Sequence, residues 1–419
     1  MLDVPVRKVT IIGAGIVGLA TALTLQSEGH SVTLIDPRPP GSGTSFGNAG
    51  AIVSGGVVPT AVPGLWKRVP KMLLDPMSPL KIRWPYLPRL APWLLRFLDA
   101  SREAKALKIS RDLSTLTEHC LDAHHRLADL AGARSILKPV GWLKVYRDED
   151  AYAGTAYDRG LMDLAGVNYQ HLNSDELRQL EPGISRDYTV GLFQPDASFV
   201  STPYALSQAL FAAFTERGGV HHQEEVRRFE FGDNGEPRAV VTTHAIHPVE
   251  TLVIAAGAWS KQLARQLGSK VSLDTERGYH LSFARTEAGP VLNRPTLFGG
   301  PQFVLSPMAD GIRLNAGVEL AGIDAEPDFT RIKALVPLAQ QCLPGLSGEI
   351  TREWMGYRPS TPDSKPVIGR SPVHGNVLYA FGHGHMGLGL SAITARLIAD
   401  LVAGRESQIS LAPFAADRF

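Results

Sequence analysis

The stretch that decides the fold is Val9–Ala20, which reads VTIIGAGIVGLA. Residues 7–12 form an apolar run that predicts a buried strand, and the glycines that follow it predict a tight turn. Apolar residues then recur at helical spacing until Gly29, and a second apolar run, SVTLID, ends at Asp36. A strand, a helix and a strand of this length predict a right-handed parallel crossover unit.

Each glycine of the motif Gly13-x-Gly15-x-x-Gly18 has a mechanical role in this unit. Gly13 permits the turn, Gly15 lets backbone N–H groups approach a pyrophosphate, and Gly18 permits close packing of helix on strand. Asp36 would accept hydrogen bonds from the ribose hydroxyls. The motif predicts an adenine dinucleotide, and both NAD and FAD use it. The contacts predicted in this unit are Gly13, Gly15, Ile16, Val17, Gly18, Asp36, Pro37 and Arg38.

Three later segments favour FAD. A loop rich in Gly and Ser at 41–56 can wrap the pyrophosphate and the flavin edge, and the apolar strand expected at 251–260 runs into small residues. The turn at 382–389 opens a helix, whose free N–H groups and dipole suit the charge on a reduced flavin. The contacts predicted in these segments are Thr44, Ser45, Asn48, Ala49, Gly50, Ala51, Ala256, Gly257, Trp259, Gly382, His383, Gly384, His385, Met386, Gly387 and Leu388. Val226, Gly356 and Arg358 are expected as further contacts of the cofactor.

Chain length, net charge and cysteine content exclude several other classes of protein. With 419 residues and 44% apolar content the chain can bury two interleaved domains, and a net charge of +1 gives no global attraction for nucleic acid. Cys120 and Cys342 make no CxxC pair, so a reduced intracellular compartment is favoured. We expect no metal site, because His383 and His385 lack further ligands at suitable spacing. We also expect no membrane-spanning helix and no signal peptide.

Together these segments resemble the D-amino-acid oxidase superfamily of flavoproteins, in particular the bacterial D-amino-acid dehydrogenase small subunit and hydroxy-D-proline dehydrogenase. The resemblance covers almost the whole chain, through VTIIGAGIVGLATALTLQSEGHSVTLID, TSFGNAGAI, LVIAAGAWS, GYRPSTPDSKPVIG and NVLYAFGHGHMGLGLSAITARLIADL. It implies an α/β fold in which a Rossmann-like FAD-binding domain of the glutathione-reductase type is interleaved with an α+β substrate domain on a mixed or antiparallel sheet. We expect the FAD-binding domain at 1–60, 100–135, 190–262 and 355–419, and the substrate domain at 61–99, 136–189 and 263–354.

The resemblance also implies site residues. The block that begins at Gly356 is similar to the family segment whose arginine holds the substrate carboxylate, and here that arginine is Arg358, which can grip it bidentately. Tyr279 and His383 are expected beside the substrate or the flavin. The alternative for Tyr279 is packing on its strand, and the alternative for His383 is that it only caps the turn. Because no cysteine lies inside the block, FAD is expected to be non-covalent.

The implied reaction is oxidation of a D-amino acid, or of a cyclic imino acid of the D-proline or hydroxy-D-proline type, by hydride transfer from the α-carbon to flavin N5. Three alternatives stay open: a sarcosine or glycine oxidase that uses oxygen, a flavin electron carrier without catalysis, and an NAD-dependent dehydrogenase. The segment 64–99 mixes basic, aromatic and leucine residues, which indicates a lid or a peripheral membrane contact. We expect a quinone or dye rather than oxygen as electron acceptor, and a cytoplasmic location with or without contact to the inner face of the membrane.

Overall fold

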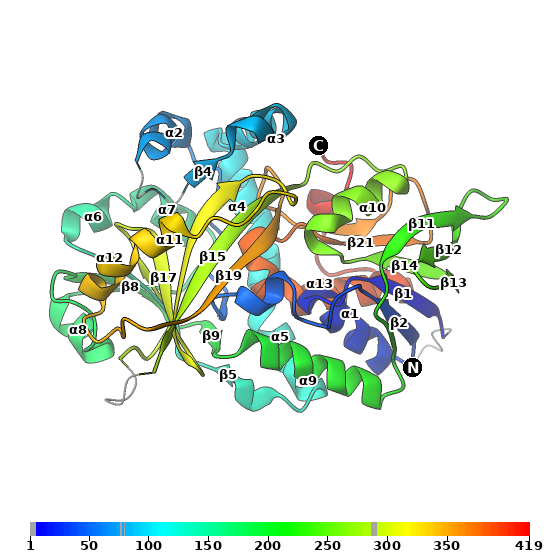
Figure 1. The fold of residues 1–419 in the computed structure, drawn as a ribbon, viewed down its shortest axis with the longest axis horizontal. Helices are drawn as coiled ribbons and strands as arrows, with labels where there is room; N and C mark the ends of the chain where they lie inside the picture. The colour runs from blue at the N-terminus through cyan, green and yellow to red at the C-terminus, as the bar shows by residue number, and fades with distance from the viewer. Residues whose placement is uncertain (1–5, 76–77, 79, 286–290) are drawn as a thin grey trace.

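The computed structural model describes residues 6–75, 78, 80–285 and 291–419, which fold around two large sheets that lie side by side (Figure 1). The first sheet has six strands, and only its last strand runs antiparallel to its neighbour. In spatial order they are β10 (Val220–His222), β2 (Ser31–Ile35), β1 (Lys8–Ile12), β14 (Thr251–Ile254), β21 (Val377–Phe381) and β20 (Val367–Arg370).

Both faces of the first sheet are covered, which explains why its strands read as continuous apolar runs. On one face Val9 and Ile11 pack in a core with the long helices, while on the other Ile12 joins a separate core with Phe229 and Leu263. The helices of the first face are α1 (Ile16–Ser27), α4 (Glu103–Thr117), α5 (Cys120–Leu130), α9 (Pro203–Glu216) and α13 (Gly387–Ala403). The second face is covered by β11 (Val226–Phe231), β12 (Pro237–Thr242), β13 (Ile246–Pro248) and α10 (Ser260–Gln266).

The window Gly384–Ala403 is long and apolar enough to cross a membrane, with a mean hydropathy of 1.5. No other described segment passes this test of length and composition. Its helix α13 packs against α1 and α5, and 61% of the window is buried inside the molecule. Burial on several sides therefore accounts for its apolar character, as in a core helix.

The second sheet is mixed, as predicted: most of its neighbouring strands are antiparallel, but β16 pairs with β6, and β4 with β18, in parallel. Its strands in spatial order are β19 (Ile350–Ser360), β15 (Asp274–Ala284), β18 (Gly311–Leu320), β17 (Phe303–Met308), β16 (Thr296–Phe298), β6 (Trp142–Tyr146), β8 (Val190–Gln194) and β7 (Gln170–Leu172), with β4 (Leu80–Ile82) on β18. The short helices of this half are α6 (Glu149–Ala153), α7 (Ala156–Leu164), α8 (Ser174–Leu180), α11 (Thr330–Ala334) and α12 (Val336–Cys342).

Two local predictions differ from the structure. The strand expected at 251–260 ends at Ile254, because the chain turns at Gly257, where φ is +55°, into the 3-10 helix η4 (Gly257–Trp259). The loop expected at 41–56 contains the 3-10 helix η1 (Thr44–Gly47) and the strand β3 (Ala51–Val53), whose partner is β9 (Ala197–Val200). The other short elements are β5 (Leu137–Lys138), η3 (Arg134–Ile136), η5 (Gly384–Met386) and η6 (Ala412–Phe414).

Strand pairing bears on where the two domains meet. Both β8 and β19 are hydrogen-bonded into the second sheet. The boundary expected at 190 assigns all of β8 to the FAD-binding domain, and the boundary expected at 355 divides β19 between the two domains. We propose that these two boundaries lie at the ends of the strands, after Gln194 and Ser360.

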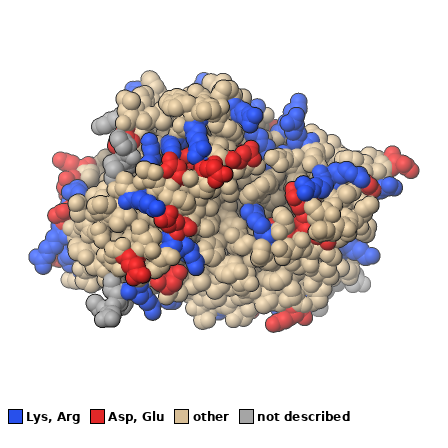
Figure 2. Space-filling model, viewed as in Figure 1, with Lys and Arg blue, Asp and Glu red and all other residues tan. Residues whose placement is uncertain are grey.

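The segment 64–99 lies at one end of the strands of the second sheet, where β4 pairs with the last residues of β18 (Figure 1, top). It forms α2 (Leu65–Leu74), the 3-10 helix η2 (Trp84–Tyr86) and α3 (Leu87–Ala100), while residues 76, 77 and 79 lie outside the described part. Figure 2 shows acidic and basic side chains intermixed over this face of the molecule, in keeping with the small net charge.

Candidate active site

A cavity of about 1780 Å³ opens between the two sheets and is lined by residues of both. Pockets for drug-sized ligands occupy roughly 300–1000 Å³, so this one has room for a dinucleotide together with a small substrate. Most of the predicted cofactor contacts border it: Gly13, Gly15, Ile16, Val17, Asp36, Pro37, Arg38, Thr44, Ser45, Asn48, Ala49, Ala51, Val226, Ala256, Gly257, Trp259, Gly356, Arg358, His383, Gly384, His385, Met386, Gly387 and Leu388.

Three predicted contacts do not border the cavity, and each has a backbone role instead. A Cβ on Gly18 would overlap the carbonyl of Gly13, and one on Gly50 would overlap the carbonyl of Val200. Gly382 has a φ of +82°, a conformation that residues with a Cβ rarely adopt. These glycines let neighbouring segments approach closely, which positions the residues that do line the cavity.

The glycine-rich turn after β1 presents a cradle that fits a pyrophosphate. Gly13 has a φ of +112°, and a Cβ there would overlap the backbone of Ala255 at the end of β14. Gly15 caps α1 without a side-chain hydrogen bond, while the N–H of Ile16 donates to Ser45 Oγ at 3.0 Å. The N-terminus of α1 thus faces the cavity with backbone donors and its positive dipole end, an arrangement that suits an anionic ligand.

At the end of β2 the carboxylate of Asp36 is held by the backbone. It accepts hydrogen bonds from the N–H groups of Ala14 and Arg38, both at 2.9 Å. The guanidinium of Arg38 lies 4.3 Å from the centre of the Trp259 ring, and both residues line the cavity. Since each carboxylate oxygen can accept more than one hydrogen bond, Asp36 retains acceptor capacity for the predicted ribose contact.

The loop at 44–51 is held in place by the second sheet, through side chains that the sequence patterns did not single out. Gly47 O accepts from Asn315 Nδ2 at 3.0 Å and lies 3.3 Å from His280 Nδ1, while Asn48 O accepts from Arg313 at 2.8 Å. Burial and the nearby Arg313 lower the pKa of His280 to about 3, so its ring is neutral at physiological pH.

Arg358 stands on the edge strand β19 with its guanidinium against Gly278 of β15. A Cβ on Gly278 would overlap the guanidinium, and Arg358 Nη1 donates to the carbonyl of Gly317 at 2.9 Å. Burial lowers the pKa of Arg358, while the neighbouring carboxylate of Glu276 opposes that shift. The glycine therefore provides the space in which a planar cation can lie flat on the sheet beside the cavity.

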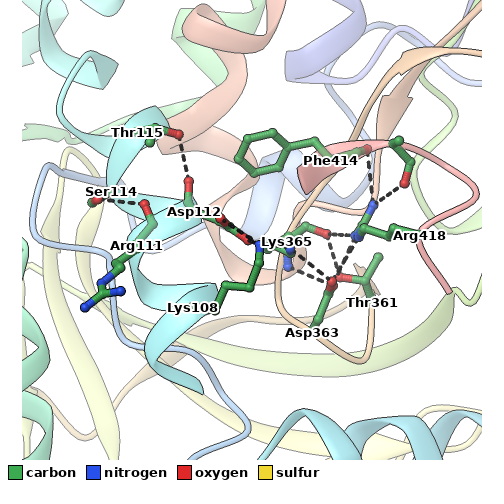
Figure 3. A network of polar contacts seen from close by, with 11 residues as sticks. Lys108, Arg111, Asp112, Ser114, Thr115, Thr361, Asp363, Lys365, Phe414 and Arg418 are labelled. Carbon is green, nitrogen blue, oxygen red and sulfur yellow. Dashed lines mark hydrogen bonds and ion pairs between the residues drawn. The ribbon is translucent and has the colours of Figure 1, made fainter. Parts of the chain in front are cut away.

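The chain just after Arg358 is clamped by a network of ion pairs and hydrogen bonds (Figure 3). Arg418, near the C-terminus, grips both carboxylate oxygens of Asp363 at 2.9 and 3.1 Å and donates to the carbonyl of Lys365 at 2.7 Å. Lys365 Nζ in turn donates to Asp112 of α4 at 2.7 Å. The turn that follows β19 is thereby tied to both a helix and the C-terminal segment.

The two other predicted catalytic residues are engaged within the protein. Tyr279 borders the cavity, but its hydroxyl donates to Glu319 and accepts from the N–H of Asp328 at 3.2 Å. His383 is 2% exposed and its Nε2 lies 2.9 Å from Thr394 Oγ1 of α13, while burial lowers its pKa to about 3. Both side chains thus have partners within the protein, and a direct role of either beside the substrate stays a prediction.

His385 lies on the cavity side of the same turn. Its Nε2 is 3.2 Å from Thr60 Oγ1, and its Nδ1 is 3.7 Å from Glu276 Oε2. Burial lowers its pKa. Glu276, which no sequence pattern had indicated, thus shares a corner of the cavity with His385 and Arg358.

Among the described residues, one group of side chains has the geometry to hold a metal ion, and it was not predicted. The ligand atoms of His222, Glu224 and His247 lie within 4.8 Å of one another, beside the end of β10. In the structure Glu224 Oε2 accepts hydrogen bonds from His247 Nε2 at 2.8 Å and from the hydroxyl of Thr242. These contacts satisfy the carboxylate within the protein.

Comparison with known proteins gives a consistent result over nearly the whole chain. The family described as FAD dependent oxidoreductase, DAO, matches residues 8–401. A D-amino-acid oxidase of Bradyrhizobium diazoefficiens is 37% identical over 420 residues, covering 99% of each chain. A D-amino acid dehydrogenase 2 of Ralstonia nicotianae is 32% identical and covers 98% of this chain and 100% of its own.

Solved structures share the fold at lower identity. Glycine oxidase from Geobacillus kaustophilus has a TM-score of 0.74 at 23% identity and covers 99% of this chain and 100% of its own. L-Proline dehydrogenase from P. horikoshii has a TM-score of 0.74 at 18% identity and covers 99% and 98%. At this level of identity the likeness concerns the fold.

Proposed function

Because the chain belongs to the DAO family of FAD-dependent oxidoreductases, we propose that its substrate is a D-amino acid or a cyclic imino acid of the D-proline type. The enzyme uses FAD, and the predictions of fold class, enzyme class and cofactor are confirmed. Support for the substrate class comes from relatives over 30% identical, which are named as a D-amino-acid oxidase and a D-amino acid dehydrogenase.

One observation carries the assignment of the substrate to this cavity: the guanidinium of Arg358 lies on the sheet beside it, with its position set by Gly278 and Gly317. A fixed planar cation at this place can grip an α-carboxylate bidentately and thereby fix the pose of the α-carbon. The main contribution of the protein to catalysis is therefore to bind the substrate and to orient its α-carbon.

The cofactor would be held by the residues around the first glycine motif. The N–H groups at the start of α1 face the pyrophosphate position, Asp36 stands where the ribose is expected, and the loop at 44–51 and the turn at 382–388 border the rest of the cavity. When bound, FAD supplies the hydride acceptor for the oxidised carbon. Because Cys120 and Cys342 are both buried, and neither is among the residues that line the cavity, we propose that the cofactor is non-covalent.

We test this function by anaerobic absorbance titration of the purified protein with D-amino acids, hydroxy-D-proline isomers, sarcosine and L-amino acids. Bleaching of the flavin band by one or more D-amino or D-imino acids is expected. Bleaching by L-amino acids alone, or by sarcosine alone, would reject the substrate class. A yellow protein that no compound reduces would instead indicate an electron carrier.

The electron acceptor is a separate proposal, since the similar proteins include both an oxidase and a dehydrogenase. We propose a quinone rather than oxygen. Turnover with D-amino acid should then be fast with a soluble quinone and slow in air, and hydrogen peroxide should accumulate slowly. Fast peroxide formation in air would assign the oxidase reaction.

For the segment 64–99 we propose a lid over the cavity. Leu65, Trp66 and Val69 of α2, and Trp93, Leu94 and Phe97 of α3, all line the cavity. The indole N–H of Trp93 donates to the carbonyl of Ser360 at 3.0 Å, which ties α3 to the strand that carries Arg358. Trp66, Leu74 and Trp84 are more than half exposed, as apolar side chains that enter a membrane interface would be. Co-sedimentation of the protein with anionic lipid vesicles tests this alternative.

A further inference from the structure

Glu276 lines the cavity, and one of its two carboxylate oxygens, Oε2, is buried. The residue is only 4% exposed, and within the described part of the chain its Oε2 makes no hydrogen bond. The ring of His385 lies close by, with Nδ1 at 3.7 Å from Oε2, but burial lowers the pKa of that ring and so disfavours its cationic form. A carboxylate removed from water without hydrogen bonds is costly, so this position calls for a donor that the protein itself does not supply.

Its place on the strand directs Glu276 toward the cavity. Along β15 the odd-numbered Tyr279, Leu281 and Phe283 pack in the core of the second sheet, so the even-numbered side chains lie on the opposite face. On that face Glu276 pairs directly across the strands with Arg358. Directly opposite residues have Cβ atoms about 5 Å apart. The Arg358 guanidinium extends from there over Gly278, and the Glu276 carboxylate is near enough to oppose the fall that burial causes in the Arg358 pKa.

A second buried carboxylate, on the neighbouring strand, differs from Glu276 in that its hydrogen bonds are supplied by the protein. Glu319 of β18 is 2% exposed, yet it accepts from Arg277 at 3.1 Å and from Arg83 at 3.2 Å, and also from the hydroxyl of Tyr279. It is saturated by its own protein, as structural buried carboxylates usually are. Glu276 is equally buried but is left with open acceptor positions next to the cation that would hold a substrate.

We propose that Glu276 accepts hydrogen bonds from the α-amino group of the substrate whose carboxylate is held by Arg358. This inference rests on the proposed function. An α-amino acid carries its cation and its anion on the same carbon, and neighbouring strands present the matching pair of opposite charges. Glu276 is then the residue that selects amino acids over 2-hydroxy acids of the same carbon skeleton.

The test compares three ligands that differ only in the group on the α-carbon: D-alanine, D-lactate and propionate. In the FAD-loaded Glu276→Gln variant, KM for D-alanine should rise about 10- to 100-fold, the effect of losing a charged hydrogen bond. The Ki of propionate against D-alanine should stay the same or fall, because the competing carboxylate beside Arg358 has been neutralised. The preference for D-alanine over D-lactate should shrink by the same factor as KM rises.

Glu353→Gln is the matched control. Glu353 lies on β19 as well, but it faces outward, where it pairs with Lys333 at 2.7 Å. Its kinetic constants should equal those of the unmodified enzyme. Glu276→Asp is a second variant in case Glu276→Gln fails to fold. It keeps the negative charge but shortens the side chain by one methylene. The KM for D-alanine should rise here too, while the Ki of propionate stays near its original value.

Two results would overturn the inference while leaving the proposed function intact. If Glu276→Gln raises the KM for D-alanine and the Ki of propionate by the same factor, Glu276 only orients Arg358. If the loss is confined to D-lysine and D-arginine, Glu276 recognises a cationic side chain instead of the α-amino group. If no amino acid bleaches the flavin of the unmodified enzyme, the proposed function fails, and this inference fails with it.

Discussion

At the residue scale, Arg358 carries the largest expected effect on binding. Truncation to alanine removes a bidentate cation, which we expect to raise KM for D-amino acids at least 100-fold, or about 3 kcal/mol. FAD should remain bound, since the first glycine motif is untouched. The measurement is KM together with the ratio of flavin absorbance to protein absorbance.

Arg265→Ala is the control for that substitution, because Arg265 is exposed on α10 away from the second sheet. Kinetic constants of Arg358→Ala that match those of this control would remove Arg358 from the site.

Gly278 should be nearly as sensitive, although it has no side chain. A Cβ at this position would overlap the Arg358 guanidinium, so Gly278→Ala must displace the cation. We expect KM to rise about 10-fold, roughly 1.4 kcal/mol, with kcat changed less. Gly300→Ala is the comparison, since a Cβ there meets nothing within 4 Å and should leave KM unaltered. Equal KM values for Gly278→Ala and Gly300→Ala would show that substrate binding by Arg358 does not need the space beside Gly278.

At the element scale, the turn after β19 depends on the clamp drawn in Figure 3. Arg418→Ala removes the bidentate contact to Asp363. Among the described residues this leaves the mostly buried carboxylate with Lys365 as its one cationic neighbour, at 3.7 Å. We expect the free energy of unfolding to fall by about 3 kcal/mol.

Urea unfolding followed by circular dichroism measures the change, with Arg265→Ala again as the neutral control. If the contacts of Arg418 with the turn do not stabilise the fold, the free energy of unfolding of Arg418→Ala will lie within about 0.5 kcal/mol of the unmodified protein.

At the scale of the whole molecule, several buried histidines make the fold sensitive to mild acid. Burial lowers the pKa of His124 to about 4, and those of His280 and His383 to about 3. In the unfolded chain these rings titrate near pH 6.5. Below that value the unfolded state binds more protons, so the stability present at pH 7 is lost as the pH falls through 6 to 5.

Each such histidine contributes a slope of about 1.4 kcal/mol per pH unit in that window. Unfolding free energies measured at pH 7, 6 and 5 should show the fall, and His383→Gln should reduce the slope between pH 6 and 5 by the share of one histidine, about 1.4 kcal/mol per pH unit. The glutamine can keep a hydrogen bond to Thr394, so a retained slope would mean that His383 is accessible to protons in the folded state.

Much of the first sheet and its ligand could be predicted from the sequence, because the signals there are local. Gly13, Gly15 and Gly18 stand within one turn between a strand and a helix, and their spacing follows from backbone sterics alone. The predicted contacts of this unit line the cavity, apart from Gly18, which acts through the backbone.

Only the tertiary structure could reveal how the second sheet completes the site. Glu276, Gly278 and Gly317 lie far from Arg358 along the chain but contact or neighbour it through strand pairing, and His280, Arg313 and Asn315 reach across to the loop at 44–51. No short motif encodes cross-strand register, and the face to which a side chain points depends on that register. For the same reason the sequence could not show that Glu276 would line the cavity with a buried carboxylate oxygen, or that the hydroxyl of Tyr279, whose place beside the substrate stays a prediction, would donate to Glu319.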